Sequence, residues 1–201
     1  ASAVNMLNVA VGYNAGAAVT TGIKNTFVGG LAGDATTTAS ENVAVGYDSL
    51  GTNILGSHSV AVGPSALRTQ NYGTATNAYN TAVGSFAGYA ITTGISNTLI
   101  GGDAGKAVTT GNENILIGKG AGDTLTDADY NVAIGATALT SDTLGSRSVA
   151  IGQEALSAQN FTTATDTYNV AVGFLAGKAI TTGISNTLIG GLTGDALTDA
   201  D

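Results

Sequence analysis

The chain has 201 residues but no cysteine and no tryptophan, and only one each of proline, methionine and histidine. Without cysteine it can form neither a disulfide nor a thiolate metal site. The single histidine, His58, lies five residues before a recurring glycine, at a position that elsewhere holds residues as different as Lys24 and Glu41. That tolerance indicates a solvent-facing side chain and not a catalytic base. We therefore expect no enzyme active site and no cofactor.

Charge is scarce as well. Lys and Arg together number 6 and Asp and Glu 14, a net charge of −8, and the basic residues are scattered. A nucleic-acid surface needs clustered basic residues, so no nucleic-acid partner is expected. No stretch approaches the roughly 18 apolar residues of a membrane helix. We expect no membrane contact from this segment.

Glycine, by contrast, is abundant, with 30 residues. Eleven glycines recur at a spacing of seventeen positions, which lengthens to twenty-one between Gly63 and Gly84 and between Gly152 and Gly173. A fixed short period is typical of a chain that stacks one structural unit on the next. These periodic glycines are Gly12, Gly29, Gly46, Gly63, Gly84, Gly101, Gly118, Gly135, Gly152, Gly173 and Gly190.

The same short phrase precedes each periodic glycine. It reads Asn or Ser, then Val, Thr or Ile, then Ala, Leu or Phe, then Val or Ile, as in Asn8–Gly12 and Asn97–Gly101. β-Branched residues suit a pleated, packed strand, and glycine permits the backbone of a corner. The pattern predicts a strand that ends at a corner in every unit. The Asn residues are expected to form a stacked ladder from unit to unit.

A longer period lies above the short one. A shift of 89 positions superimposes Ala90–Gly102 on Ala179–Gly191 without a mismatch, so four short units and one long one form a block that is repeated. We interpret residues 1–201 as a single continuous repeat domain, with two such blocks and part of a third. Both ends fall within a unit, and we expect the chain to be a fragment of a longer fibre.

These features predict an all-β fold, a parallel β-solenoid or β-roll of about twelve 17-residue coils. Seventeen residues leave room for two or three short strands per coil and none for a helical crossover. Equivalent strands would then stack in parallel from coil to coil.

Alternation along the strands predicts self-association. Val9 and Val11 face one way, and Ala10 faces the other with Asn8. Both faces are apolar, but a thin coil has only one interior. The other face would leave a long apolar stripe in water unless other copies of the chain cover it. We expect a parallel homo-oligomer.

Two kinds of coil carry a resemblance to known proteins. Ser57–Ala66 (SHSVAVGPSA) and Ser146–Ala155 (SRSVAIGQEA) resemble the head repeats of trimeric autotransporter adhesins. Asn80–Thr98 and Asn169–Thr187 look like repeats of marine phage tail fibres and of some bacterial surface proteins. The resemblance implies a left-handed coil, an elongated homotrimer and an extracellular location. The coils here are longer than those of adhesin heads, so corner positions are not transferred.

Only two carboxylates suggest a metal site. Asp127 and Asp129 are two residues apart in a Leu-Thr-Asp-Ala-Asp segment, a spacing that could offer two oxygens to calcium. The alternative is a solvated turn. Calcium-binding repeats have a period of nine residues, whereas the period here is seventeen, so the turn is the better interpretation. We expect no metal and keep these two residues as the only candidates.

The two four-residue insertions, near residues 71–78 and 160–167, are the best candidates for a binding surface. Insertions in solenoids form outward loops that often lie on a binding face. Both contain or precede aromatic residues, which are candidates for contact with a host-surface glycan or protein receptor. These are Tyr72, Tyr79, Phe161 and Tyr168.

Taken together, the sequence predicts a structural and adhesive protein, a rod-like segment of a phage or phage-like tail fibre that spaces or presents a receptor-binding tip. The alternative is the head of a bacterial trimeric surface adhesin. A more distant alternative is a secreted solenoid enzyme that degrades polysaccharides. All three place the chain outside the cell.

Overall fold

A computed structural model describes residues 6–199, and these residues form strands and turns but no helix. Eleven three-residue strands make up one sheet, and four two-residue strands make up two small sheets. The large sheet holds β1 (Val9–Val11), β2 (Thr26–Val28), β3 (Val43–Val45), β5 (Val60–Val62), β7 (Thr81–Val83), β8 (Thr98–Ile100), β9 (Ile115–Ile117), β10 (Val132–Ile134), β12 (Val149–Ile151), β14 (Val170–Val172) and β15 (Thr187–Ile189). The small sheets pair β4 (Gly56–Ser57) with β6 (Thr76–Asn77), and β11 (Gly145–Ser146) with β13 (Thr165–Asp166).

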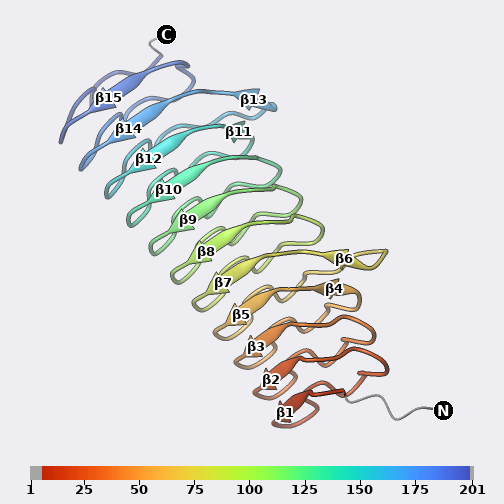
Figure 1. Ribbon diagram of the computed structural model, residues 1–201. Coiled ribbons are helices and arrows are strands. Elements are labelled where there is room, and N and C mark those ends of the chain that lie inside the picture. The colour runs from red at the N-terminus through yellow and green to blue at the C-terminus, as the bar shows by residue number, and fades with distance from the viewer. Residues whose placement is uncertain (1–5, 200–201) are drawn as a thin grey trace.

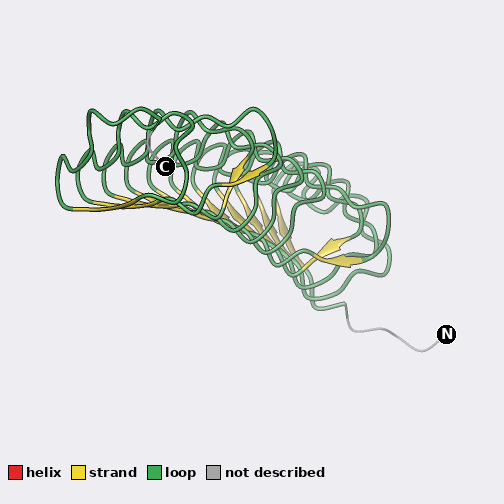
Figure 2. Ribbon diagram, turned by 90° about the horizontal axis from the view of Figure 1, so that it is seen from above, coloured by secondary structure: helices red, strands yellow, loops and turns green. Residues whose placement is uncertain are grey.

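The chain is a parallel β-solenoid, as the period predicts. Each strand of the large sheet pairs in parallel with the strand of the next coil, one period along, so that Val9 pairs with Thr26 and Val11 with Val28. The coils form a continuous stack, and the two small sheets lie on one side of it (Figure 1). The stack is gently curved, and the large sheet follows one side of it from end to end (Figure 2).

The stack has eleven strand-bearing coils within the described residues, not the twelve or so expected from the chain length. Two of these coils are lengthened by the insertions, and part of the chain at each end does not complete a coil. A count made by dividing the length by the period therefore overestimates the number of coils.

Most coils contain one strand, not the two or three that were expected. Each coil bends through left-handed residues that interrupt extended backbone, such as Asp48, Leu50 and His58, whose φ angles are 56°, 51° and 60°. Neighbouring coils are still joined there by backbone hydrogen bonds, as where the amide of Leu50 donates to the carbonyl of Ala66 at 3.1 Å. The sides away from the large sheet are thus stacked turns rather than strands.

The periodic glycines stand where no other residue fits. Their φ angles lie between 129° and 143°, a backbone conformation that residues with a side chain rarely adopt. A Cβ placed on Gly84 would lie 2.4 Å from the carbonyl oxygen of Gly101 in the next coil. The prediction of a corner glycine is confirmed, and close stacking of coils is the reason for it.

The structure shows which strand face is the interior. The middle residue of each strand is buried from Phe27 to Leu188, whereas the residues on either side of it point outward. Within the core a large residue at one position is matched by a small one at another. Phe27 faces Gly33, where an added Cβ would lie 2.5 Å from the ring, while Ala61 shares its coil with the buried Leu67.

The Asn ladder is present, and it runs largely through the backbone. The side-chain oxygen of Asn25 accepts from the backbone amide of Asn42 at 3.0 Å, and the side-chain amide of Asn42 donates to the carbonyl of Gly56 at 2.9 Å. Each Asn therefore joins its own coil to the next, and those from Asn25 to Asn169 are buried. The amide group satisfies backbone groups that would otherwise lack partners.

Candidate functional site

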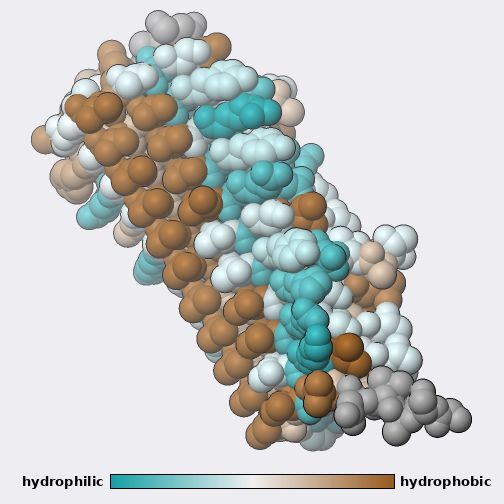
Figure 3. Space-filling view, viewed as in Figure 1, coloured by the Kyte–Doolittle hydropathy of each residue, from teal (hydrophilic) through white to brown (hydrophobic). Residues whose placement is uncertain are grey.

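The surface formed by the large sheet is the most uniform feature of the molecule. We define the outer face as the first and third residues of the eleven strands of that sheet, and all of them are Val, Thr or Ile. In space-filling view the apolar side chains form two columns along the length of the stack (Figure 3). No charged residue interrupts these columns.

This outer face lies partly open to solvent. Ile100 and Ile115 are 38% and 41% exposed, and most other members are intermediate because each packs against the residue above and below it. Eleven strands about 4.8 Å apart give a stripe about 50 Å long and about 10 Å wide, on the order of 500 Å². A contiguous apolar patch of that size is in the range of the largest patch on a soluble monomer, and such patches often bind a partner.

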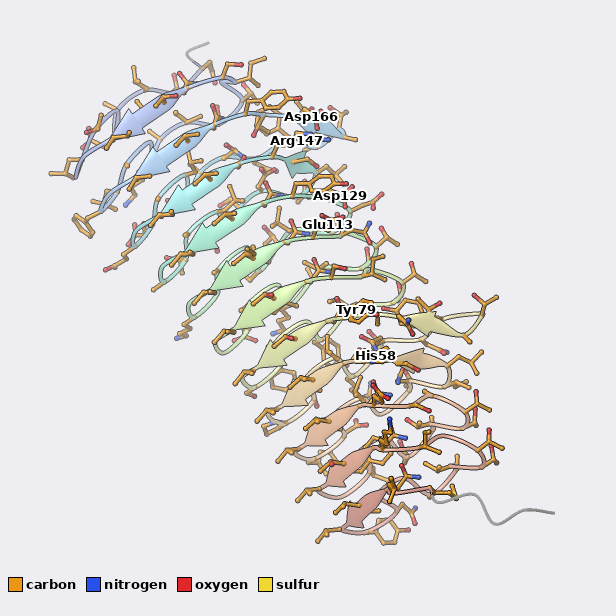
Figure 4. All side chains as sticks on the ribbon, viewed as in Figure 1. His58, Tyr79, Glu113, Asp129, Arg147 and Asp166 are labelled. Atoms are coloured by element: carbon orange, nitrogen blue, oxygen red, sulfur yellow. The ribbon has the colours of Figure 1, made fainter. Side chains whose placement is uncertain are left out.

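A mostly polar column flanks the outer face. We call it the corner column, and it holds the residue five positions before each periodic glycine, in the left-handed conformation throughout, with φ angles of 51–63°. Its members are Leu7, Lys24, Glu41, His58, Tyr79, Ser96, Glu113, Tyr130, Arg147, Tyr168 and Ser185. Figure 4 shows several of these side chains along the same edge of the stack.

The lower part of the corner column is a ladder of charged and aromatic groups. The Lys24 ammonium lies 3.0 Å from Oε1 of Glu41, and Nδ1 of His58 lies 3.2 Å from Oε2. The hydrogen bond from Lys24 lowers the pKa of the Glu41 carboxyl. The imidazole of His58 stacks on the Tyr79 ring, with centroids 5.2 Å apart. His58 thus faces solvent in a surface ladder, as its position in the repeat predicted.

The upper part of the corner column is a second ladder. The guanidinium of Arg147 lies over the Tyr130 ring, 4.6 Å from its centroid, and its Nε lies 3.1 Å from Oδ1 of Asp166. The Tyr168 hydroxyl donates to Oδ2 of the same carboxylate at 3.2 Å. The Asp166 carboxylate raises the pKa of Arg147. The ladders lie at equivalent places in the two repeated blocks but differ in chemistry.

Two of the four aromatic residues proposed for receptor contact are buried. Tyr72 and Phe161 are 6% and 7% exposed. The Tyr72 hydroxyl donates to the carbonyl of Gly94 at 2.8 Å, and burial raises its pKa. These rings fill the space that each insertion opens inside its coil. A side chain that lines the core offers no surface to a receptor, so the prediction is wrong for these two residues.

Tyr79 and Tyr168 are exposed, at 56% and 55%. They follow the inserted segments 73–77 and 162–166, which are mostly exposed and project from the stack with β6 and β13 (Figure 1). The prediction that the insertions form outward loops is confirmed. Their aromatic residues divide into one inward and one outward ring per insertion.

The candidate metal ligands are engaged with the preceding coil. Asp127 accepts a hydrogen bond from the hydroxyl of Thr110, and Oδ1 of Asp129 accepts from the backbone amide of Asn112 at 2.6 Å and from its side-chain amide at 3.2 Å. Within residues 6–199 no group of three or more acidic, His or Cys side chains could hold a metal ion. The two carboxylates accept hydrogen bonds that join neighbouring coils.

The surface has no enclosed site in the part of the chain that the structure describes, where no pocket is found. What the arrangement offers is an extended apolar stripe bordered on one side by the mostly polar corner column. Sequence reasoning foresaw the apolar stripe but not the ladders of the corner column. The sequence did contain a signal for these ladders, because residues at the same position of successive repeats must lie one above another.

In comparisons with protein-family models, curated proteins and solved structures, the chain matches none. Residues 6–199 contain no helix long and apolar enough to cross a membrane.

Proposed function

We propose that this chain is a rod-like segment of an extracellular fibre, in which copies of the chain associate in parallel through the outer face. The single observation that carries the proposal is the unbroken column of Val, Thr and Ile along the whole sheet. With the residues that border it on either side, the surface available to each partner is on the order of 1,000 Å², comparable to the roughly 800 Å² of a standard interface.

The mechanism is mechanical. Each coil is joined to the next by backbone hydrogen bonds around most of its circumference. Stability in such a stack is the sum of nearest-neighbour contacts, and the structure extends in one direction only. Such a segment is suited to hold a tip at a distance. We favour a phage or phage-like tail fibre, assembled as a homotrimer in keeping with the resemblance of the repeats.

A second candidate is the head of a bacterial trimeric adhesin. The observation in its favour is the pair of segments Ser57–Ala66 and Ser146–Ala155. In either case the parts that would meet a host-surface glycan or protein are the two projecting insertions. Tyr79 and Tyr168 would contribute from the rim of the interface between copies, since the corner column borders the outer face. Loss of cell or glycan binding in Tyr79→Ala/Tyr168→Ala would support that role, and unchanged binding would argue against it.

The oligomer is tested by sedimentation equilibrium. The unmodified chain is expected to form a homotrimer at micromolar concentration, and Ile100→Glu/Ile151→Glu, which places two charges on the outer face, is expected to be monomeric with an unchanged β circular dichroism spectrum. The matched control Thr74→Glu/Thr163→Glu adds the same charge to the exposed insertions. A monomeric unmodified chain would refute the proposal.

A further inference from the structure

Within the described residues, one basic side chain forms no ion pair with a carboxylate. Among the six Lys and Arg residues, all within the described region, five form ion pairs with a carboxylate, namely Lys24, Arg68, Lys106, Arg147 and Lys178. Lys119 has no such partner among the described residues. Two of the three Glu residues are likewise paired, and the exception is Glu113.

The two unpaired residues belong to the same coil. Glu113 and Lys119 flank β9 and are both exposed, as is Ile115, whereas Asn114 and Leu116 are buried. Both charged residues therefore border the outer face, on opposite edges. Figure 4 shows Glu113 on the corner-column edge.

Within one chain these charges stay apart. Strand β9 and the residues on either side of it separate them by on the order of 15 Å. The Glu113 edge is the corner column. The opposite edge carries the residue that follows each periodic glycine, which we call the far-edge column. Lys119 is the only charged residue in it; its members are Tyr13, Gly30, Tyr47, Pro64, Ser85, Gly102, Lys119, Ala136, Gln153, Phe174 and Gly191.

We propose that Glu113 of one copy forms an ion pair with Lys119 of the next copy across the interface of the parallel oligomer, and that this pair sets the register of the assembly. The inference rests on the self-association argued above. Cyclic symmetry places the same coil of every copy at the same height along the axis. With the outer faces turned toward that axis, the corner column of each copy lies beside the far-edge column of its neighbour.

The pair discriminates against a slip of one coil. Displacement by one coil would place Glu113 beside Gly102, next to the Asp103 carboxylate, or beside Ala136. It would place Lys119 beside Ser96 or Tyr130. Every alternative leaves both charges without an opposite charge in the facing column, although the Val, Thr and Ile columns would pack almost equally well.

The pair also discriminates against a slip of one whole block. Displacement by a block would preserve the repeated apolar pattern, because the two blocks are similar along their length. In that register Lys119 would face Lys24, which is the corner-column residue equivalent to Glu113 in the first block. Like charges brought together at an interface disfavour the wrong arrangement, which is how polar residues set register in other repetitive assemblies.

A charge-swap experiment tests the pair. Glu113→Lys and Lys119→Glu are each expected to weaken association by about tenfold or more, because each places like charges together, whereas Glu113→Lys/Lys119→Glu restores it to within about threefold of the unmodified chain. The losses should shrink in 1 M salt, since salt screens a bordering ion pair but not apolar packing. Asp195→Lys, an equal change of charge at an exposed position outside both columns, is the control.

Cross-linking tests the register directly, since the chain has no cysteine of its own. Glu113→Cys/Lys119→Cys should link neighbouring copies through a short bis-maleimide, while the one-coil control Ser96→Cys/Lys119→Cys should link poorly. An oligomer that is indifferent to the charge reversals, or that cross-links equally in both cysteine pairs, overturns this inference alone. A monomeric unmodified chain overturns both this inference and the proposed function.

Discussion

At the scale of single residues, the fold depends on glycines whose missing side chains let one coil lie on the next. In the periodic glycines from Gly12 to Gly173 the obstacle to a side chain is the backbone of the neighbouring coil, which has no freedom to move aside. Other glycines in the same chain have no such neighbour. The same residue type therefore has very different importance at different positions.

Gly84→Ala tests this directly. The new Cβ would lie 2.4 Å from the carbonyl oxygen of Gly101, at a φ of 142°, so we expect a loss of about 3 kcal/mol or more in the free energy of unfolding. Gly73→Ala is the control, because nothing lies within 4 Å of a Cβ at that position, and its effect should stay within about 0.5 kcal/mol. Chemical denaturation measures both, and similar losses in the two variants would contradict the explanation.

Asp34 offers a test by pH. Partial desolvation and the nearby Asp48 carboxylate raise the pKa of the Asp34 carboxyl. A carboxyl with a pKa raised by folding stabilises the folded state when protonated, and this contribution is lost as the pH rises through the folded pKa. Asp34→Asn should therefore raise the melting temperature slightly at pH 7 and leave it unchanged at pH 3, relative to the unmodified chain at each pH.

Thermal melts at the two pH values check this prediction. Asp195→Asn is the matched control, because Asp195 occupies the corresponding position of the last coil and is exposed. It should leave the melting temperature unchanged at both pH values. A gain for Asp34→Asn that is as large at pH 3 as at pH 7 would show that charge is not the cause.

At the scale of the coil, the interior is narrow enough that side-chain volumes must compensate one another. Where the coil is lengthened by an insertion, the added space is filled by an aromatic ring and by buried polar groups. Gln70 donates to Oγ of Ser59 at 3.0 Å and accepts from the side-chain amide of Asn80 at the same distance. All buried side-chain polar atoms in the described residues have a partner.

Gln70→Ala should therefore lower the free energy of unfolding by more than the removal of its buried methylene groups alone would. It leaves the buried amide of Asn80 and the hydroxyl of Ser59 each with one partner fewer, and it opens a cavity, so we expect a loss of about 2–4 kcal/mol. Gln153→Ala, at an exposed glutamine, should change stability by no more than about 0.5 kcal/mol. Urea titration of both variants measures the difference, and equal effects would mean that the network contributes little.

At the scale of the whole molecule, a stack of similar coils should tolerate removal of a complete block. Deletion of residues 85–173 removes one block and joins Gly84 to Phe174, which follows the equivalent glycine in the second block. The strands on either side keep their place in the repeat. Because stability depends on nearest-neighbour contacts, the shortened chain should still fold, with a circular dichroism spectrum of the same β type and a lower free energy of unfolding.

Deletion of residues 85–169 is the matched control. It spans five short periods instead of a whole block and joins Gly84 to Val170, so a strand residue falls where the corner should continue. This variant should lose cooperative unfolding. Circular dichroism and thermal melts compare the two deletions, and an equally cooperative control would show that the two longer coils are not needed for register.

Much of the architecture could be predicted from the sequence, because a coil that repeats must satisfy its neighbours at every turn. The period, the parallel pairing, the corner glycines and the outward insertions all follow from positions that recur along the chain. Less of the candidate site could be predicted. Tyr72 and Tyr79 are both aromatic and lie beside the same insertion, yet one ring fills the core and the other faces solvent.

The sequence by itself determined that this chain is a β-solenoid with an apolar residue on each side of its strands. Only the tertiary structure decided which side is inside, since Val11 and Ala10 are equally compatible with burial as residues. The closed coil leaves room for a single column of middle residues matched to small neighbours, and so turns the β-branched columns outward. The same closure keeps Glu113 and Lys119 on opposite sides of the outer face, because they lie beyond opposite ends of strand β9 and one chain cannot bring those two ends together.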